Sequence, residues 1–171
     1  MSDERIDNRL DRVLEQSGNR LGFVFRHYHL PPQERFDRFR ELAAIARRRG
    51  HLVILSDSAL TAREWGADGI YGAPLSLYPR RRDLIRIATA HDMTEIAQAN
   101  RLGADAVMLS PLFATRSHPG AQTLGPARFR QIARHANMPV IALGGMDADK
   151  ARQLDWPRWA AINGLAEPLA K

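Results

Sequence analysis

The chain has 171 residues, of which 44% are hydrophobic and 26% charged, with a net charge of +6, an ordinary composition for one globular domain spanning residues 1–171. Cysteine is absent, which excludes disulfides, thiol catalysis and cysteine metal sites, and the short apolar runs and charged first residues predict neither a membrane span nor a secretory signal. We therefore expect a cytoplasmic protein without a nucleic-acid partner, because the arginine runs at 47–49 and 80–82 are not interleaved with aromatic residues that stack on bases.

From its N-terminus the chain alternates helical patterns with short apolar runs. The first helix is predicted over residues 3–16, where Ile6 and Leu10 share a face, and a longer helix runs from Pro32 to a stop at Gly50. Further helices are predicted over residues 59–65, 92–102 and 148–154 and after residue 125, and strands over residues 21–25, 52–55, 68–71, 84–88, 106–109, 140–143 and 159–162. This alternation predicts an α/β fold with a parallel sheet. A (β/α)8 barrel of the TIM type and an open doubly wound sheet both fit, and the absence of a G-x-G-x-x-G fingerprint and of a P-loop favours the barrel.

The stretch from Gly103 to Gly145 has the order strand, polar loop, helix, strand and glycine turn, which is typical of a parallel βαβ unit. In such units, chemistry gathers in the loops that follow the carboxyl ends of the strands. Gly144 and Gly145 precede Asp147, a good helix N-cap, so we expect their backbone N–H groups to face an anion. The alternative is a structural turn that needs glycine for a positive φ.

Five segments follow one another along the chain as FVFRHY, ILSDSALTAREWGADGIY, TAHDMTEIAQANRLGAD, GADAVMLSPLFATRSHPGAQTLG and IALGG. In this order they resemble the thiamine phosphate synthase/TenI family of (β/α)8 barrels, over residues 21–165. The resemblance implies a thiamine-biosynthesis protein whose first strand is reduced to residues 1–3 and whose last helix is cut to residues 165–171. Because an unpaired parallel edge is unfavourable, we expect an open seven-strand barrel or a homo-oligomer in which another copy supplies a strand.

For a synthase, the resemblance implies Mg²⁺ held by two carboxylates, and cations that hold a diphosphate. Arg26 matches the arginine of the family's Gln-x-Arg-x-Lys pattern, as a catalytic contact to a phosphate or diphosphate or, alternatively, as an ion pair at the rim. Asp57 matches one magnesium carboxylate, or it caps the helix that follows. No carboxylate stands at the second metal position, within residues 72–76. The cluster at residues 27–29 is expected to line the pocket.

His91 follows a predicted strand and matches a histidine of the family. In TenI-type thiazole tautomerases, that histidine resembles a general acid/base that moves a proton on the thiazole carboxylate phosphate. The alternative is a polar histidine that caps the next helix. The resemblance further implies that the phosphorylated ligand is bound by Thr115, Ser117, His118, Gly144, Gly145, Asn163 and Gly164.

Three functions stay open on this basis, each with a small phosphorylated thiazole or pyrimidine as the ligand. The first is a thiamine phosphate synthase that uses Mg²⁺. The second is a metal-free thiazole tautomerase that uses His91. The third is a non-catalytic relative that binds a phosphate ester. Most of the family's residues that bind the metal and the diphosphate are replaced in this chain, whereas most of those that bind the thiazole phosphate are kept. This difference favours thiazole-phosphate chemistry or binding.

Overall fold

A computed structural model of the chain describes residues 1–18, 20–80, 82–115, 120 and 122–162. The chain folds into two compact units: unit 1 comprises Met1–Tyr71 and Arg81–Ile85, and unit 2 comprises Gly72–Arg80 and Arg86–Lys171. Both units contain parallel strands connected through helices, which confirms the predicted α/β class. Within the described residues, none of the helices combines the length and the apolar character that a bilayer span requires.

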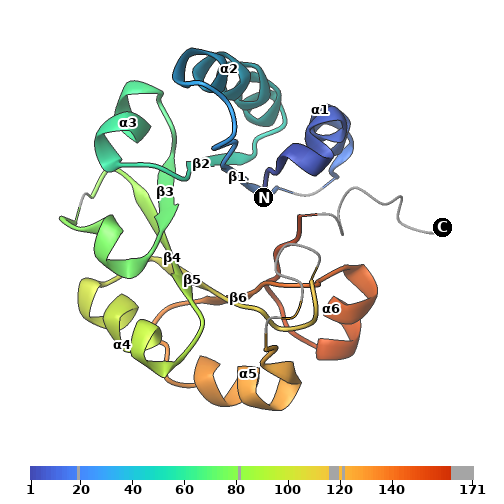
Figure 1. Ribbon diagram of the computed structural model, residues 1–171, viewed down its shortest axis with the longest axis vertical. Helices are drawn as coiled ribbons and strands as arrows, with labels where there is room; N and C mark the ends of the chain where they lie inside the picture. Colours follow the sequence, from blue (N-terminus) through green and yellow to red (C-terminus); the bar gives the residue numbers. More distant parts are fainter. Residues whose placement is uncertain (19, 81, 116–119, 121, 163–171) are drawn as a thin grey trace. The chain divides into compact units, whose positions relative to one another are not determined.

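Unit 1 contains parallel strands in the order β1-β2-β3. Its elements are η1 (Glu4–Ile6), α1 (Asp7–Gln16), β1 (Gly22–Phe25), α2 (Pro32–Arg48), β2 (Leu52–Leu55), α3 (Ala59–Glu64) and β3 (Gly69–Gly72). Parallel pairing places Phe25 beside Leu55 and Ile54 beside Gly69, so the carboxyl ends of the strands lie at one edge of the sheet. The helices lie on one side of these strands (Figure 1), where Phe39 of α2 is buried with its ring centroid 5.4 Å from that of Phe25.

Unit 2 contains parallel strands in the order β4-β5-β6. Its elements are η2 (Pro74–Leu77), β4 (Ile85–Ala90), α4 (Met93–Leu102), β5 (Ala106–Leu109), α5 (Gly125–Ala133), β6 (Val140–Ala142) and α6 (Ala148–Leu154). Ala88 pairs with Val107, which in turn pairs with Val140, so the carboxyl ends again share one edge. The helices α4, α5 and α6 lie on one side of the strands (Figure 1), and a single parallel bridge joins Trp159 to Ala142.

The two ends of the described chain differ from a full strand and helix pattern. The segment before η1 forms no strand, but the Ser2 N–H donates to the Val24 carbonyl of β1 at 2.7 Å, as a neighbouring strand would. The run predicted as a strand over residues 159–162 is limited to a single parallel bridge at Trp159. The predicted last helix falls on residues 165–171, outside the described residues. Strand borrowing by a second copy stays a prediction.

A buried arginine joins β4 to the end of α4. The Arg86 guanidinium is 2% exposed and donates from Nη1 to the Leu102 carbonyl at 2.9 Å and from Nη2 to the Gly103 carbonyl. Its backbone N–H donates to Asp105 at 2.8 Å, and its Nε lies 3.5 Å from the same carboxylate oxygen. The carbonyls at the end of a helix lack donors within the helix, so the Arg86 side chain replaces the missing backbone donors.

A second buried group, His27, connects the N-terminal segment to the end of β1 within unit 1. His27 was expected to line a pocket, but it is 1% exposed, with Nδ1 hydrogen-bonded to Ser2 Oγ at 2.9 Å and Nε2 to Asp7 Oδ1 at 2.9 Å. The Arg38 guanidinium donates to the same Asp7 oxygen at 2.9 Å, and the His29 ring centroid lies 5.3 Å away. Burial lowers the pKa of His27, and the partner carboxylate of Asp7 only partly offsets it.

This burial predicts a loss of stability in mild acid. The unfolded chain binds a proton on His27 near its ordinary pKa of 6.5, whereas the folded chain binds it only at lower pH, so folding is weakened as pH falls below 6.5. One such proton adds a slope of at most about 1.4 kcal/mol per pH unit to the free energy of unfolding. The free energy of unfolding in urea is measured from roughly pH 7.5 to pH 5, a range that includes the titration of histidine. The slope should be smaller in His27→Gln than in the unsubstituted protein and unchanged in His135→Gln. An unchanged slope in His27→Gln would contradict the prediction.

Candidate functional site

The residues expected to carry function follow the carboxyl ends of the strands in both units. In unit 1, Arg26 follows β1 and Asp57 lies beyond β2. In unit 2, His91 follows β4, Thr115 lies in the loop after β5, and the glycine pair 144–145 follows β6. The four remaining predicted residues, Ser117, His118, Asn163 and Gly164, lie outside the described residues. Each unit therefore has its own group of candidate residues at the carboxyl ends of its strands.

In unit 1, both oxygens of the Asp57 carboxylate already have partners. Arg35 donates from Nη1 to Oδ2 at 2.6 Å, and the Ser58 N–H donates to Oδ1 at 2.7 Å. Burial would raise the pKa of Asp57, but the hydrogen bonds from Arg35 and Ser58 outweigh it and lower the pKa. The expected alternative role of Asp57 as a helix cap is wrong, because the N-cap of α3 is Ser58, whose side chain accepts from the Thr61 N–H.

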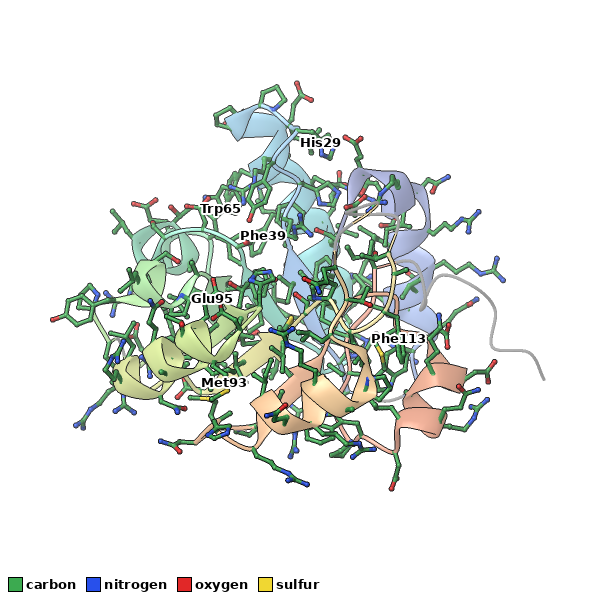
Figure 2. All side chains as sticks on the ribbon, turned by 60° about the horizontal axis from the view of Figure 1, so that its bottom comes forward. His29, Phe39, Trp65, Met93, Glu95 and Phe113 are labelled. Carbon is green, nitrogen blue, oxygen red and sulfur yellow. The ribbon has the colours of Figure 1, made fainter. Side chains whose placement is uncertain are left out.

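Arg35, on α2, forms hydrogen bonds to several groups at the carboxyl edge of the unit 1 strands. Besides its ion pair with Asp57, it donates from Nε to the Arg26 carbonyl at 2.9 Å and from Nη2 to the Ser56 carbonyl at 3.1 Å. Its guanidinium lies 5.3 Å from the ring centroid of Trp65, whose ring packs beside that of Phe39 (Figure 2). A planar cation fixed by three acceptors and an aromatic face has little freedom to rearrange.

Arg26 differs from Arg35 in having its charge available. Within the described part of the chain, its guanidinium makes no hydrogen bond or ion pair, and it lies 5.7 Å from the ring centroid of Tyr28. Tyr28 is 62% exposed, and its hydroxyl donates to Ser56 Oγ, which in turn donates to the Tyr71 carbonyl at 3.2 Å. Burial raises the pKa of Tyr71 to about 12, so its phenol remains a proton donor at neutral pH. Among the described residues at the carboxyl edge of unit 1, Arg26 is thus a cation without a carboxylate partner.

In unit 2, His91 is held by a carboxylate from the next turn of the chain. Glu95 of α4 (labelled in Figure 2) accepts from the His91 backbone N–H at 2.6 Å and lies 2.8 Å from His91 Nδ1. Asp92 is the N-cap of α4 and accepts from the Glu95 N–H at 2.9 Å. A proton on Nδ1 shared with the carboxylate leaves Nε2 as a base, and among the described residues Nε2 has no hydrogen-bond partner. His91 is exposed, as an acid/base that meets a ligand must be.

The glycine pair after β6 packs against the loop after β5. Gly144 has φ +98°, and a Cβ there would lie 2.7 Å from Pro111 Cα; Gly145 has φ +62°, and a Cβ there would lie 2.4 Å from the Ala114 carbonyl oxygen. The Leu112 N–H donates to the Leu143 carbonyl at 2.9 Å across the same contact. Both the positive φ and the close approach require glycine, which supports the structural alternative without removing the anion-binding one.

The backbone of this turn also has the groups that an anion needs. Among the described residues, the N–H groups of Gly144 and Gly145 donate to no acceptor. Lys150 Nζ lies 2.8 Å from the Gly145 carbonyl and 2.9 Å from Asp147 Oδ2, so a cation stands beside the turn. The predicted N-cap is confirmed, because Asp147 Oδ1 accepts from the Lys150 N–H at 2.8 Å. Thr115 is half-buried in the adjoining loop.

Replacing Gly145 by Ala is expected to destabilise unit 2 by about 3 kcal/mol, from the cost of a positive φ plus the overlap with backbone atoms of the β5 loop. Gly50→Ala is the matched control, because Gly50 has φ +70° but open space around its Cβ, and should cost only about 1 kcal/mol. The free energies of unfolding in urea provide the measurement. Equal losses in the two variants would mean that the loop contact contributes nothing.

Metal ligands are not grouped in the parts of the chain that the structure describes. No set of three or more His, Asp or Glu side chains there is arranged to hold an ion. In unit 1, Asp57 has both oxygens in use. The residues present in these parts therefore do not fit the Mg²⁺ that the sequence resemblance implies for a synthase.

Sequence reasoning missed Arg35, Glu95 and Lys150. Glu95 had a detectable signal, because Asp92-x-x-Glu95 is a capping-box pattern directly after His91. Lys150 had a weaker one, three residues after the N-cap Asp147. Arg35 had none, since it lies 22 residues from Asp57 and meets it only once α2 has packed on the strands.

Comparisons with known proteins bear on the family and the fold of the chain. The profile of the family described as thiamine monophosphate synthase matches residues 3–161. A protein of Aquifex aeolicus is 30% identical over 148 residues, which are 84% of this chain and 78% of that protein. The thiamine-phosphate synthase of Chloroflexus aurantiacus is 31% identical over 149 residues, 83% of this chain and 67% of the synthase. The solved structure of thiamine phosphate pyrophosphorylase from Pyrococcus furiosus is similar, with a TM-score of 0.78 at 22% identity over 98% of this chain and 86% of its own, which confirms the barrel-type fold.

Proposed function

Because the chain belongs to the thiamine monophosphate synthase family, we propose that it binds a thiazole phosphate at the carboxyl ends of β4, β5 and β6 and moves a proton on a thiazole carboxylate phosphate through His91, without a metal. The observation that carries this proposal is the pairing of His91 with Glu95, which leaves Nε2 available as a base. An imidazole oriented by a carboxylate suits proton transfer near neutral pH.

The phosphate of the ligand is assigned to the turn after β6. Gly144 and Gly145 supply backbone N–H groups without acceptors among the described residues, and Thr115 supplies a hydroxyl from the neighbouring loop. Lys150 adds positive charge beside the turn, shared with Asp147. Backbone donors bind phosphate whatever the side chains around them, so this group supports phosphate binding even where side chains differ from the family pattern.

In the tautomerase reaction, His91 Nε2 takes a proton from one carbon of the ligand and, as the imidazolium, returns a proton to another. No bond to phosphate is broken and no electrons are gained or lost. Glu95 keeps the proton on Nδ1 and stabilises the imidazolium that forms. The chemistry therefore needs only groups that this unit provides.

A synthase is the second candidate, favoured by a relative named thiamine-phosphate synthase at 31% identity. That reaction would place the diphosphate at Arg26, a cation without a carboxylate partner among the described residues, at the carboxyl edge of unit 1. The ion pair of Asp57 with Arg35 argues against it, because a magnesium site would need the Asp57 carboxylate.

Two assays with the same preparation test these proposals. In the first, a thiazole carboxylate phosphate tautomer is incubated with the protein and followed by NMR; conversion to the other tautomer above the no-protein rate is expected. In the second, pyrimidine diphosphate and thiazole phosphate are incubated with Mg²⁺, and mass spectrometry searches for thiamine phosphate. Thiamine phosphate formation without tautomer conversion would replace the first candidate by the second. If neither product forms while thiazole phosphate binds, the protein is a non-catalytic binder.

A further inference from the structure

The helix α1 is attached at both of its ends to a buried histidine from the strands beside it. His27, just beyond β1, has its Nε2 2.9 Å from Oδ1 of Asp7, the first residue of α1. His51, directly before β2, has its Nε2 3.0 Å from the carbonyl oxygen of Leu14, in the last turn of α1. The two histidines are 1% and 4% exposed. Neither ring takes part in the proton transfer proposed for unit 2.

The contacts of His51 determine which of its ring nitrogens carries the hydrogen. Because a carbonyl oxygen can only accept, Nε2 must donate its hydrogen to Leu14. The Leu21 backbone N–H donates to Nδ1 at 3.3 Å, so Nδ1 must be without a hydrogen. Among the described residues the ring has no carboxylate partner, and Arg20, which precedes Leu21, donates to the Gly50 carbonyl at 2.9 Å. A second proton on the ring would set two donors against each other, so His51 must leave this position to become charged.

The contacts of His27 require the same placement of its hydrogen. Burial would raise the pKa of Asp7, but hydrogen bonds from His27 and Arg38 outweigh it and lower the pKa, so the carboxylate is ionised and Nε2 must donate to it. The Ser2 hydroxyl accepts from the Arg26 N–H at 2.7 Å, and its own hydrogen has His27 Nδ1, at 2.9 Å, as the acceptor. A proton on Nδ1 would leave the Ser2 hydroxyl hydrogen without an acceptor among the described residues.

The surroundings of His27 also disfavour a second proton on its ring. Burial is the largest effect and lowers the pKa of His27; the carboxylate of Asp7 raises it, and the charges of His29 and Arg38 lower it. His29 in turn lies 3.6 Å from the carboxylate of Glu4. The backbone of His27 has φ +42°, in the left-handed region that side chains rarely adopt. The contacts of the neutral ring therefore hold the backbone in a conformation that it would leave once they break.

We propose that residues 1–3, η1 and α1 form a strap along β1, held by the two neutral histidines His27 and His51, which opens in mild acid while the other elements of unit 1 stay folded. The closed strap admits neither ring as a cation, whereas in the open strap water hydrates both rings, and each takes up a proton below about pH 6.5. Acid therefore favours opening, by up to about tenfold per pH unit for each histidine. Opening would uncover the Val24 carbonyl of β1, to which the Ser2 N–H donates at 2.7 Å when the strap is closed.

The strap can open by itself because the rest of unit 1 has contacts of its own. The rings of Phe25 in β1 and Phe39 in α2 pack with their centroids 5.4 Å apart. Arg35 of α2 donates to the carbonyls of Arg26 and Ser56, beyond the ends of β1 and β2. At neutral pH the strap stays closed because its apolar side chains are buried, namely those of Ile6, Leu10 and Leu14.

Native-state hydrogen exchange of the full chain tests the strap, with amide rates corrected for the intrinsic effect of pH. The amides of α1 should be less protected than those of β2 by about tenfold or more at every pH, because the strap opens without global unfolding. Below about pH 6.5 the protection of α1 should also fall by up to about a hundredfold per pH unit, since two protons are taken up. A low concentration of urea should speed exchange in β2 far more than in α1. Equal protection in α1 and β2, or protection of α1 that does not change with pH, would overturn the proposal.

Two variants separate the contributions of the two histidines to this pH dependence. His51→Gln keeps a donor for the Leu14 carbonyl and should remove one of the two protons, so that the protection of α1 falls by only about tenfold per pH unit. His27→Asn should have the same effect, because asparagine tolerates a positive φ. His135→Gln, which replaces an exposed histidine of unit 2, is the control and should keep the full dependence. The full dependence in either His51→Gln or His27→Asn would show that the strap is not held by both rings.

Nitrogen NMR of the isotope-labelled, unsubstituted protein decides the question even if a variant fails to fold. The rings of His27 and His51 should carry hydrogen on Nε2 and none on Nδ1 at about pH 6, where a solvent-exposed histidine is mostly protonated. A proton on Nδ1 of either ring while the amides of α1 stay protected would show that the closed strap admits a charged histidine, and would refute the proposal.

Discussion

His91→Asn is expected to lower tautomer conversion by about 10² to 10⁴-fold, the range that a positioned acid/base contributes. Asparagine is polar and shorter, so Glu95 and the start of α4 lose little, whereas the atom that accepts and returns the proton is gone. The backbone N–H groups of Gly144 and Gly145, proposed to bind the phosphate, are unchanged in this variant, so binding of thiazole phosphate should stay within about twofold. Initial rates and calorimetric affinities measured on the same preparation separate the two effects.

The matched control is His135→Asn, which removes an exposed histidine of unit 2 beyond α5 and should leave the conversion rate unchanged. Turnover retained in His91→Asn would rule out His91 as the acid/base. A large loss of thiazole phosphate affinity in the same variant would instead assign His91 to binding.

Arg86→Met should produce a large loss of stability, about 3 kcal/mol. The methionine fills most of the volume of the arginine stem but leaves the carbonyls of Leu102 and Gly103 without the donors that end α4. The ion pair with Asp105 contributes little of this, because that carboxylate is 43% exposed. For a chain of this size the midpoint of thermal unfolding should fall by roughly 10 °C.

Arg63→Met is the control for Arg86→Met. Arg63 pairs with Asp83 through two hydrogen bonds of 2.7 Å, yet both side chains are exposed and screened by solvent, so its loss should change the unfolding midpoint far less than the loss of Arg86 does. Thermal unfolding followed by circular dichroism compares the two variants directly. Similar unfolding midpoints for both variants would show that burial of the Arg86 guanidinium does not increase its contribution to stability.

The strands and most helices were predictable because local patterns determine them. The apolar run at 52–55 and the helix after Ser58 agree with β2 and α3 to within a residue, and the cap at Asp147 was found from residue type alone. The strand predicted at 84–88 ends two residues later, at Ala90, because pairing with β5 extends it. The strand predicted over residues 159–162 was too long, because only Trp159 pairs, through one bridge to Ala142.

The positions of the candidate residues after the strands were predictable from the sequence, but most of their side-chain partners were not. Position after a strand correctly placed Arg26, His91 and the glycine pair at the carboxyl edges of their units. The partner of Asp57 depends on how α2 packs, which no local pattern encodes, so a residue that looked like a metal ligand is an ion-pair partner. The opposite holds for His91, whose partner Glu95 lies within one helical turn and was open to prediction.

The contact between the glycine pair and the loop after β5 has a consequence for how this protein can change. A Cβ at Gly144 or Gly145 would meet main-chain atoms of that loop, including Pro111 Cα, the Leu112 nitrogen and the Ala114 oxygen, and side-chain atoms only as far as the Cβ of Pro111 and of Phe113. Because these contacts reach loop side chains no further than Cβ, point substitutions that keep the loop backbone in place can accumulate without disturbing the turn, whereas an insertion or deletion shifts every atom in register with it. Loop length, rather than loop sequence, is therefore the property that directed evolution of ligand preference would have to conserve.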